Sequence, residues 1–166
     1  MSTITSTSLT NRNSLLRPIA LGGMIIGILH LTIQSWLVYS LIQKNPFILV
    51  EQYVASGALG DAAFEGGIAT ALLGVFFQLF ICFVISGVFF LSADRIPRLR
   101  RYAIAGSLLY GFGVFIVMNF IVLPLSAAPP LPAPTMPWLI EVILEHILIL
   151  GLPLGILVQR NANTNK

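Results

Sequence analysis

The side chains of this chain that could do chemistry are few, and they lie inside long apolar runs. They are His30, Gln34, Gln78, Asn119, Glu141, Glu145 and His146. His30 and Gln34 are four residues apart, as are Glu141 and Glu145, so each pair shares one face of a helix. Ionisable groups inside membrane spans are costly to bury and are candidates for function. These residues are therefore the candidate site.

Several chemistries can be compared with this set. Two histidines on different helices could ligate a b-type haem, which is kept as a minor alternative. A carboxylate-bridged dimetal centre needs Glu-x-x-His on two helices, whereas this chain has Glu141, Glu145 and His146 on one. Ser126 has no base in its loop, and the single Cys82 offers neither an intrachain disulfide nor a cysteine metal site. We expect no metal, no cofactor and no catalytic residue, and the sequence leans against an enzyme.

Composition indicates the class of protein. Hydrophobic residues make up 57% of the 166 residues and charged residues only 9%, against roughly 25% charged in soluble domains. The solvent of such a chain is a lipid bilayer. The basic residues are spread thinly over loop ends without interleaved aromatic residues, which argues against a nucleic-acid partner.

Four apolar runs are long enough to cross a bilayer, which takes about 20 residues in helical form. They cover residues 19–42, 68–91, 102–125 and 138–158. We therefore predict an all-α integral membrane protein, a four-helix antiparallel transmembrane bundle at residues 17–159. Residues 1–16 are predicted to be a disordered cytoplasmic N-terminus and residues 160–166 a cytoplasmic tail.

The connections between the spans are also informative. Asn45 and Pro46 are typical of a helix start, which predicts a short helix from Phe47 to Ser56, ended by Gly57. Its apolar residues Phe47, Val50 and Val54 recur at helical spacing, so this face is expected to meet the lipid and the helix to lie in the outer membrane interface. The other outer loop, residues 126–137, is rich in proline and is predicted to be a stiff, polyproline-like spacer.

The candidate site residues fall at similar depths. Counted from the outer end of each span at about 1.5 Å per residue, Asn119 lies roughly 9 Å deep, Glu145 and His146 roughly 10–12 Å, Gln34 roughly 12 Å, Gln78 roughly 15 Å and His30 roughly 18 Å. Glu141 is shallower, within reach of the outer headgroups. These groups are expected to point into the bundle, because a polar group in hydrocarbon without a partner costs several kcal/mol.

Two interpretations of this layer remain open. In one, the amides of Gln34, Gln78 and Asn119 bond across helices and simply fix the bundle. In the other, the layer is a functional pocket. Glu145 is expected to be protonated at neutral pH unless His30 or His146 is charged and close, and replacing it with Gln should leave folding intact.

Glycine spacing indicates close helix contacts. Gly23 and Gly27 are four apart, as are Gly151 and Gly155, and such pairs let backbones approach. Pro153 lies between the second pair and is expected to kink the fourth span. Two classes of function fit: a small transporter or ligand-binding protein with a pocket in the outer half of the bilayer, or a structural or accessory subunit. A homo-oligomer or another membrane-protein partner is compatible with both.

Part of the chain also resembles a known group of proteins. The segments at residues 54–60 (Val-Ala-Ser-Gly-Ala-Leu-Gly), 63–67 (Ala-Phe-Glu-Gly-Gly), 118–126 (Met-Asn-Phe-Ile-Val-Leu-Pro-Leu-Ser) and 151–153 (Gly-Leu-Pro) resemble small bacterial four-helix inner-membrane proteins, loosely YagU-like. The resemblance covers about residues 20–160 and implies fold and location, not an activity. In that group an acid often stands near His30 and a His where this chain has Gln78.

The distribution of basic residues predicts the orientation. Of the nine Lys and Arg residues, only Lys44 lies in a loop on the predicted outer side, and residues 126–137 carry no charge. Lys and Arg are retained in the cytoplasm during insertion, so both termini should face the cytoplasm of a bacterial plasma membrane. A reporter fused after Arg160 should show cytoplasmic activity, and one inserted within residues 126–137 should not. Cytoplasmic activity of the second fusion would overturn the orientation.

Overall fold

The computed structural model describes residues 7–164, with side chains for residues 15–160, and every regular element in this part is helical. The first long helix comprises α1 (Thr7–Leu29) and the π-helical η1 (His30–Ile42), and the second is α3 (Gly67–Arg95). The third comprises α5 (Ala103–Val117), η3 (Met118–Val122) and α6 (Leu123–Leu125). The fourth comprises α7 (Met136–Glu145), η4 (His146–Gly151) and α8 (Leu152–Thr164).

Among the described residues, four helices are long and apolar enough to cross a membrane: Leu15–Ile42, Gly67–Arg95, Ala103–Leu125 and Met136–Arg160. They agree with the four predicted spans to within a few residues at each end. α1 begins at Thr7, inside the segment predicted to be disordered, because extending an existing helix is far easier than nucleating one. Residues 1–6 and the side chains of Arg12 and Lys166 lie outside the described part.

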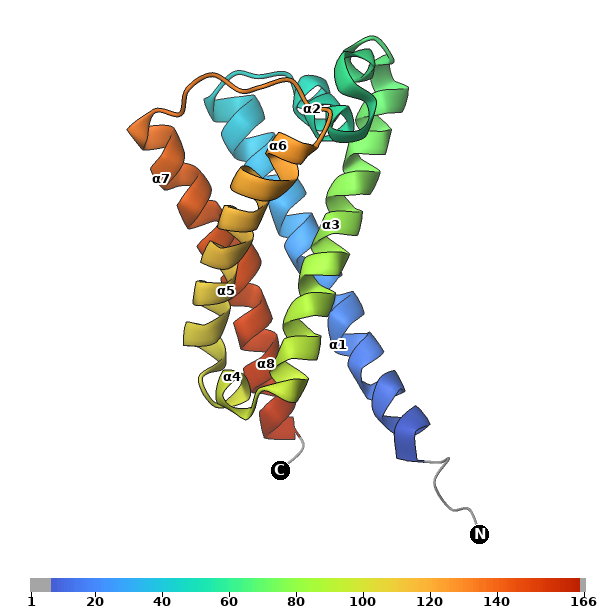
Figure 1. Ribbon diagram of the computed structural model, residues 1–166, viewed down its shortest axis with the longest axis vertical. Coiled ribbons are helices and arrows are strands. Elements are labelled where there is room, and N and C mark those ends of the chain that lie inside the picture. The colour runs from blue at the N-terminus through green and yellow to red at the C-terminus, as the bar shows by residue number, and fades with distance from the viewer. Residues whose placement is uncertain (1–6, 165–166) are drawn as a thin grey trace.

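Short helices connect the long ones. α2 (Phe47–Leu59) and η2 (Gly60–Phe64) join the first two, and α4 (Pro97–Arg101) joins α3 to α5 at the opposite end of the molecule. α2 and the loop before α7 lie at the top of Figure 1, and α4 lies at the bottom, beside α8. These two ends are called the α2 end and the α4 end below.

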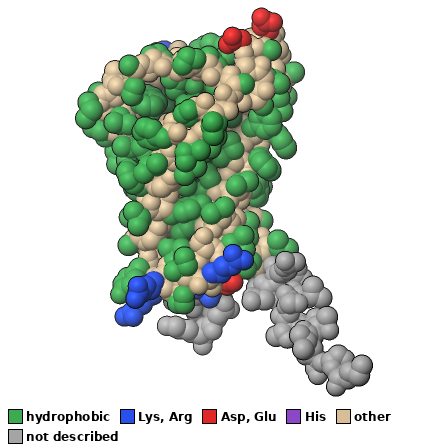
Figure 2. All heavy atoms as spheres, in the orientation of Figure 1, with side chains coloured by type: hydrophobic (Ala, Val, Ile, Leu, Met, Phe, Trp, Pro, Cys, Tyr) green, Lys and Arg blue, Asp and Glu red, His purple; other side chains and the backbone are tan. Residues whose placement is uncertain are grey.

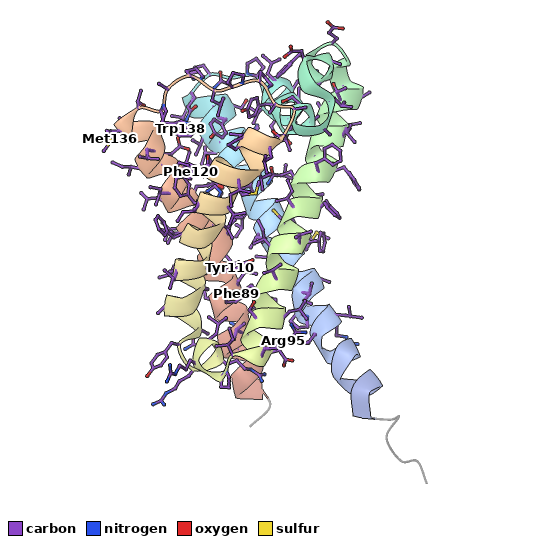
Figure 3. The ribbon with its side chains drawn as sticks, in the orientation of Figure 1. Phe89, Arg95, Tyr110, Phe120, Met136 and Trp138 are labelled. Atoms are coloured by element: carbon purple, nitrogen blue, oxygen red, sulfur yellow. The ribbon has the colours of Figure 1, made fainter. Side chains whose placement is uncertain are left out.

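The half of the molecule at the α4 end has an apolar core. Phe89 and Leu154 are fully buried there, and Cys82 and Ile26 extend this core toward the middle of the molecule. Tyr110 packs beside Phe89 between α5 and α3, with ring centroids 5.1 Å apart (Figure 3), and its hydroxyl donates to the Ile85 carbonyl at 2.8 Å. Buried aromatic rings and an interhelical hydrogen bond make this half the rigid part of the fold.

The surface reverses the pattern of a water-soluble protein. Apolar side chains cover most of the face in Figure 2. Leu72 and Phe80 on α3, for example, are 64% and 57% exposed. Conversely, Glu51, Gln52 and Glu145 are buried. Soluble proteins bury apolar groups and rarely bury Glu. This arrangement is what the predicted lipid environment requires.

α2 differs from the predicted interfacial helix in one respect. It runs to Leu59 and is ended by Gly60 at φ 60°, later than the predicted end at Gly57. No side chain caps its start, so the predicted cap from Asn45 is not formed. The prediction took Val50 and Val54 as the lipid-facing residues, which is wrong because both line an internal cavity.

The polar face of α2 packs inward. The Gln52 amide donates to the Gly67 carbonyl at 3.0 Å and to Thr70 Oγ1 at 3.1 Å, which ties α2 to the start of α3. Gly74 of α3 has no side chain to keep the backbone of Glu51 away, and a Cβ there would collide with the Glu51 carbonyl. The buried polar bonds and the close approach together hold α2 against the four long helices.

Glycines create the other close helix contacts, as predicted. Gly23 packs on Phe83 and Gly27 on Leu79, both from α3. Gly151 and Gly155 pack on α5, against the backbone of Ser107 and of Ala103. Each pair therefore joins a long helix to a neighbour within the same chain.

Gly111 and Gly113 of α5 form a matched pair for testing this packing. A Cβ on Gly111 would collide with the backbone carbonyl of His146, whereas a Cβ on Gly113 meets nothing within 4 Å. Gly111→Ala should lower the free energy of unfolding by about 1–3 kcal/mol through overpacking. Gly113→Ala should be neutral or stabilising by roughly 0.5–1 kcal/mol. Denaturation of the purified protein in detergent measures both, and equal effects would contradict the packing described.

Candidate functional site

A cavity of about 500 Å³ occupies the half of the molecule at the α2 end. Its wall is mostly apolar, with Ile81 and Ile85 from α3, Met118 from η3, and Val142 from α7. Its polar lining includes six of the seven residues selected from the sequence: His30, Gln34, Gln78, Asn119, Glu145 and His146. The prediction that these groups point inward therefore agrees with the structure, and Glu141 is the one that does not line the cavity.

Three of the long helices change to π-helix at the level of the cavity. η1 begins at His30, η3 at Met118, and η4 at His146, so each switch occurs at or next to a polar residue of the site. π-Helical turns are rare in proteins overall, and those that do occur are often found at functional sites. Hydropathy gives no indication of them, because the apolar pattern continues through all three. Pro153, which has no N–H to donate, stands just after η4.

Glu145 lies between the two histidines of the chain. His30 Nε2 is 3.0 Å from Glu145 Oε1, and His146 Nδ1 is 3.2 Å from Glu145 Oε2. His146 Nδ1 also lies 2.8 Å from the Val142 carbonyl one turn earlier, which fixes the ring. The contact with His30 closes the depth difference of about 6 Å estimated from an ideal α-helical rise. The first helix is π-helical from His30 to its end at Ile42, so the α-helical rise does not hold over that stretch. The carboxylate and the imidazoles form one cluster.

Glu141 takes part in a second, shallower cluster. The Gln34 amide donates to Glu141 Oε1 at 2.7 Å, and the Gln43 amide donates to Glu141 Oε2 at 3.0 Å. Both carboxylate oxygens are therefore satisfied by neutral donors from the first helix. These two hydrogen bonds join the first and fourth helices at the α2 end.

The other two amides do not bond across helices, contrary to the structural interpretation of the layer. Gln78 Nε2 lies 3.7 Å from Cys82 Sγ on its own helix, and Asn119 Nδ2 donates to Phe115 O on its own helix at 3.0 Å. Both side chains line the cavity instead. Of the three amides, only Gln34 joins two helices.

Glu51 is a candidate residue that the sequence analysis missed. It is fully buried on α2, and neither carboxyl oxygen has a hydrogen-bond partner of good geometry. Burial raises the pKa of the Glu51 carboxyl, while the nearby Ser35 hydroxyl and the charge of His30 oppose that rise. The spacing of Glu51, Gln52, Ala55 and Ser56 forms one helical face, which could have revealed an inward polar side. The apolar residues of α2 dominate its sequence pattern, so this polar face was not predicted.

The proline-rich loop covers the cavity. The Ala127 N–H donates to the Gly57 carbonyl at 3.0 Å, and the Tyr53 hydroxyl donates to the Pro129 carbonyl at 3.3 Å, so the loop is fastened to α2. Ala128 and Leu131 form part of the lining. A second cavity of about 490 Å³ under this loop shares Asn119 and Trp138 with the first. Trp138 and Phe120 are labelled in this region in Figure 3.

The geometry does not favour the haem alternative. A bis-histidine haem needs two imidazoles on opposite faces of an iron atom, whereas here both rings contact the same carboxylate. Within the described residues, no group of three His, Cys, Asp or Glu side chains is arranged to hold a metal ion.

Comparison with known protein families, with characterised proteins and with solved structures finds no significant match to this chain. The function must therefore be argued from the cavity and its polar groups.

Glu145→Gln should fold and keep a stability within about 1 kcal/mol of the wild type, because Gln retains the shape and a hydrogen-bond acceptor for the imidazoles. Glu145→Ala should cost about 1–3 kcal/mol, because it leaves buried imidazole nitrogens without their partner. Thermal unfolding of the purified variants, followed by circular dichroism, compares the two. An alanine variant as stable as the glutamine variant would show that the cluster contributes nothing to folding.

Proposed function

We propose that this protein is an integral membrane protein that binds a small amphipathic molecule in the cavity at its α2 end and moves it across the bilayer. The observation that carries the proposal is the cavity itself, about 500 Å³ with a mostly apolar wall and a cluster of ionisable groups. Small-molecule sites have this composition and volumes of about 300–1,000 Å³.

The membrane location rests on the four apolar helices and the reversed surface. We place the helices antiparallel in a bacterial plasma membrane, with the α4 end in the cytoplasm, because Arg95, Arg98, Arg100 and Arg101 gather there. Figure 2 supports this placement, since Lys and Arg side chains mark the α4 end. The cavity then lies in the outer half of the bilayer, beneath α2 and the proline-rich loop.

The alternative of a structural or accessory subunit has less support. Such a protein should bond its polar groups to one another and leave its glycine faces free for a partner. Here Gly23, Gly27, Gly151 and Gly155 are occupied by neighbours within the chain, and Gln78 and Asn119 face the cavity. The polar layer is therefore better explained as the lining of a binding site.

Cysteine accessibility tests the cavity. Asn119 lines it, whereas Ile121, two residues further along η3, is 50% exposed and lines neither cavity. In a Cys82→Ala background, Asn119→Cys should react with a membrane-impermeant methanethiosulfonate added from outside at least about tenfold faster than Ile121→Cys. A thiol facing lipid stays protonated and reacts slowly, because the thiolate is the nucleophile. The measurement is the rate of labelling in intact proteoliposomes.

Equal rates at the two positions, or no labelling of Asn119→Cys, would contradict a water-accessible pocket. If Asn119→Cys is labelled as expected, slower labelling in the presence of a small molecule would identify that molecule as a ligand. A purified protein with stoichiometric haem or transition metal, seen by absorbance and elemental analysis, would instead favour a redox function.

A further inference from the structure

The buried polar atoms that lack a hydrogen bond of good geometry gather at the α2 end. Among the described side chains, these atoms are His30 Nδ1, Glu51 Oε1, Glu51 Oε2 and Glu145 Oε1. Buried polar groups in folded proteins are nearly always hydrogen-bonded, so each exception calls for an explanation. All of them belong to three residues that lie close to one another at the α2 end.

His30 is the central member of the three. Its Nε2 lies 3.0 Å from Glu145 Oε1, whereas its Nδ1 is buried without a hydrogen-bond partner. Glu51 on α2 is near enough to be influenced by His30 and by Ser35, which lies one π-helical turn after His30. An imidazole with two nitrogens can exchange a proton with a partner on each side. His30 thus has one nitrogen on the carboxylate in the cavity wall and a second nitrogen left for another proton donor or acceptor.

The charges of the cluster do not balance without protons. Glu145 contacts the imidazoles of His30 and His146, Glu51 is buried nearby on α2, and no Lys or Arg is among the described residues that line the cavity. The other titratable groups nearby are Glu141, held by two amides, the Tyr39 phenol and the buried Cys82 thiol; Asp61 on η2 is exposed. Protons bound by these carboxyl groups and imidazoles therefore provide the positive charge that balances the two carboxyl groups.

We propose that His30 and Glu145 in the wall of the cavity, with Glu51 buried behind it on α2, form a proton-binding site, and that an organic cation entering the cavity displaces one proton from it. This proposal rests on the proposed function, and it assigns the ligand class and the coupling ion. One N–H or O–H bond breaks, the proton leaves to the solution on the α2 side, and one positive charge enters, so the net charge of the site is unchanged. The rings of Trp138 and Tyr53 in the lining suit a cation as well.

The buried position of Glu51 supports a bound proton, since burial raises the pKa of its carboxyl above the ordinary value of 4.5. Glu51 also lies outside the four long helices, on α2. It is therefore the member of the site from which a proton has the shortest route to the outer solution.

Infrared spectroscopy of the full chain in lipid tests the proton site without any ligand. The wild type should show a protonated-carboxyl band at neutral pH that is lost in Glu51→Gln, shifted in His30→Gln and unchanged in Glu141→Gln. Glu141 is the matched control because both of its oxygens already accept hydrogen bonds from amides. If Glu51→Gln fails to fold, Glu51→Asp should keep the band at a shifted frequency. A wild type without the band at neutral pH, or a band that survives in Glu51→Gln, overturns the proposal.

Addition of benzyltrimethylammonium tests the exchange. It should diminish the band in the wild type and release about one proton per bound cation, measured with a pH indicator in weak buffer. Benzenesulfonate, which has the same ring and the opposite charge, should do neither. If benzyltrimethylammonium slows labelling of Asn119→Cys but leaves the band unchanged, the exchange is refuted while the pocket stands. If Asn119→Cys is never labelled but the band behaves as expected, the proposed function fails and the proton site remains.

Discussion

The burial of one carboxylate, Glu145, is the constraint around which this protein is arranged. A charged group far from water costs several kcal/mol unless hydrogen bonds and opposite charge compensate it. The chain supplies that compensation with His30 from the first helix and His146 from the fourth. Bringing these rings to one carboxylate requires the first and fourth helices to approach at this level. The glycine contacts of Gly111 with His146 and of Gly151 with Ser107 make the approach of the fourth helix to α5 possible.

The two halves of the molecule are packed differently. At the α4 end, Phe89, Leu154 and Tyr110 form an apolar core that holds the helices together without polar cost. At the α2 end, the helices enclose space instead of filling it, and α2 with the proline-rich loop closes that space. A site that must admit a ligand cannot also be the most tightly packed part of a fold. The separation lets the cavity change without loss of the core.

The sequence predicts the fold far better than the site. The four long helices follow from hydropathy and length alone, because lipid leaves helices as the only simple solution for the backbone. Six of the seven selected polar residues line the cavity, because a polar side chain in an apolar span is costly to expose to lipid and so turns into the bundle. Their partners could not be predicted: Gln78 and Asn119 bond within their own helices, and Glu141 binds Gln34 and Gln43. Side-chain direction depends on the rotation of each helix, which hydropathy fixes only coarsely.

The π-helical segments have a consequence for the length of each helix. In an α-helix each residue turns the chain by about 100°. A π-helical segment departs from that angle, so the side chains beyond it point in a different direction around the helix axis than they would in an uninterrupted α-helix. η1, η3 and η4 each contribute residues to the cavity lining, among them Gln34, Asn119 and Leu150. They determine the angle around the helix axis between the face that lines the cavity and the face that packs on a neighbouring helix. In the fourth helix this is the angle between His146 and the glycines. The number of residues between these points is therefore as much a part of the site as the identity of its side chains. A single deletion in η4 between His146 and Leu150 would turn Gly155 away from Ser107 and would also rotate Leu150, which lines the cavity, relative to His146.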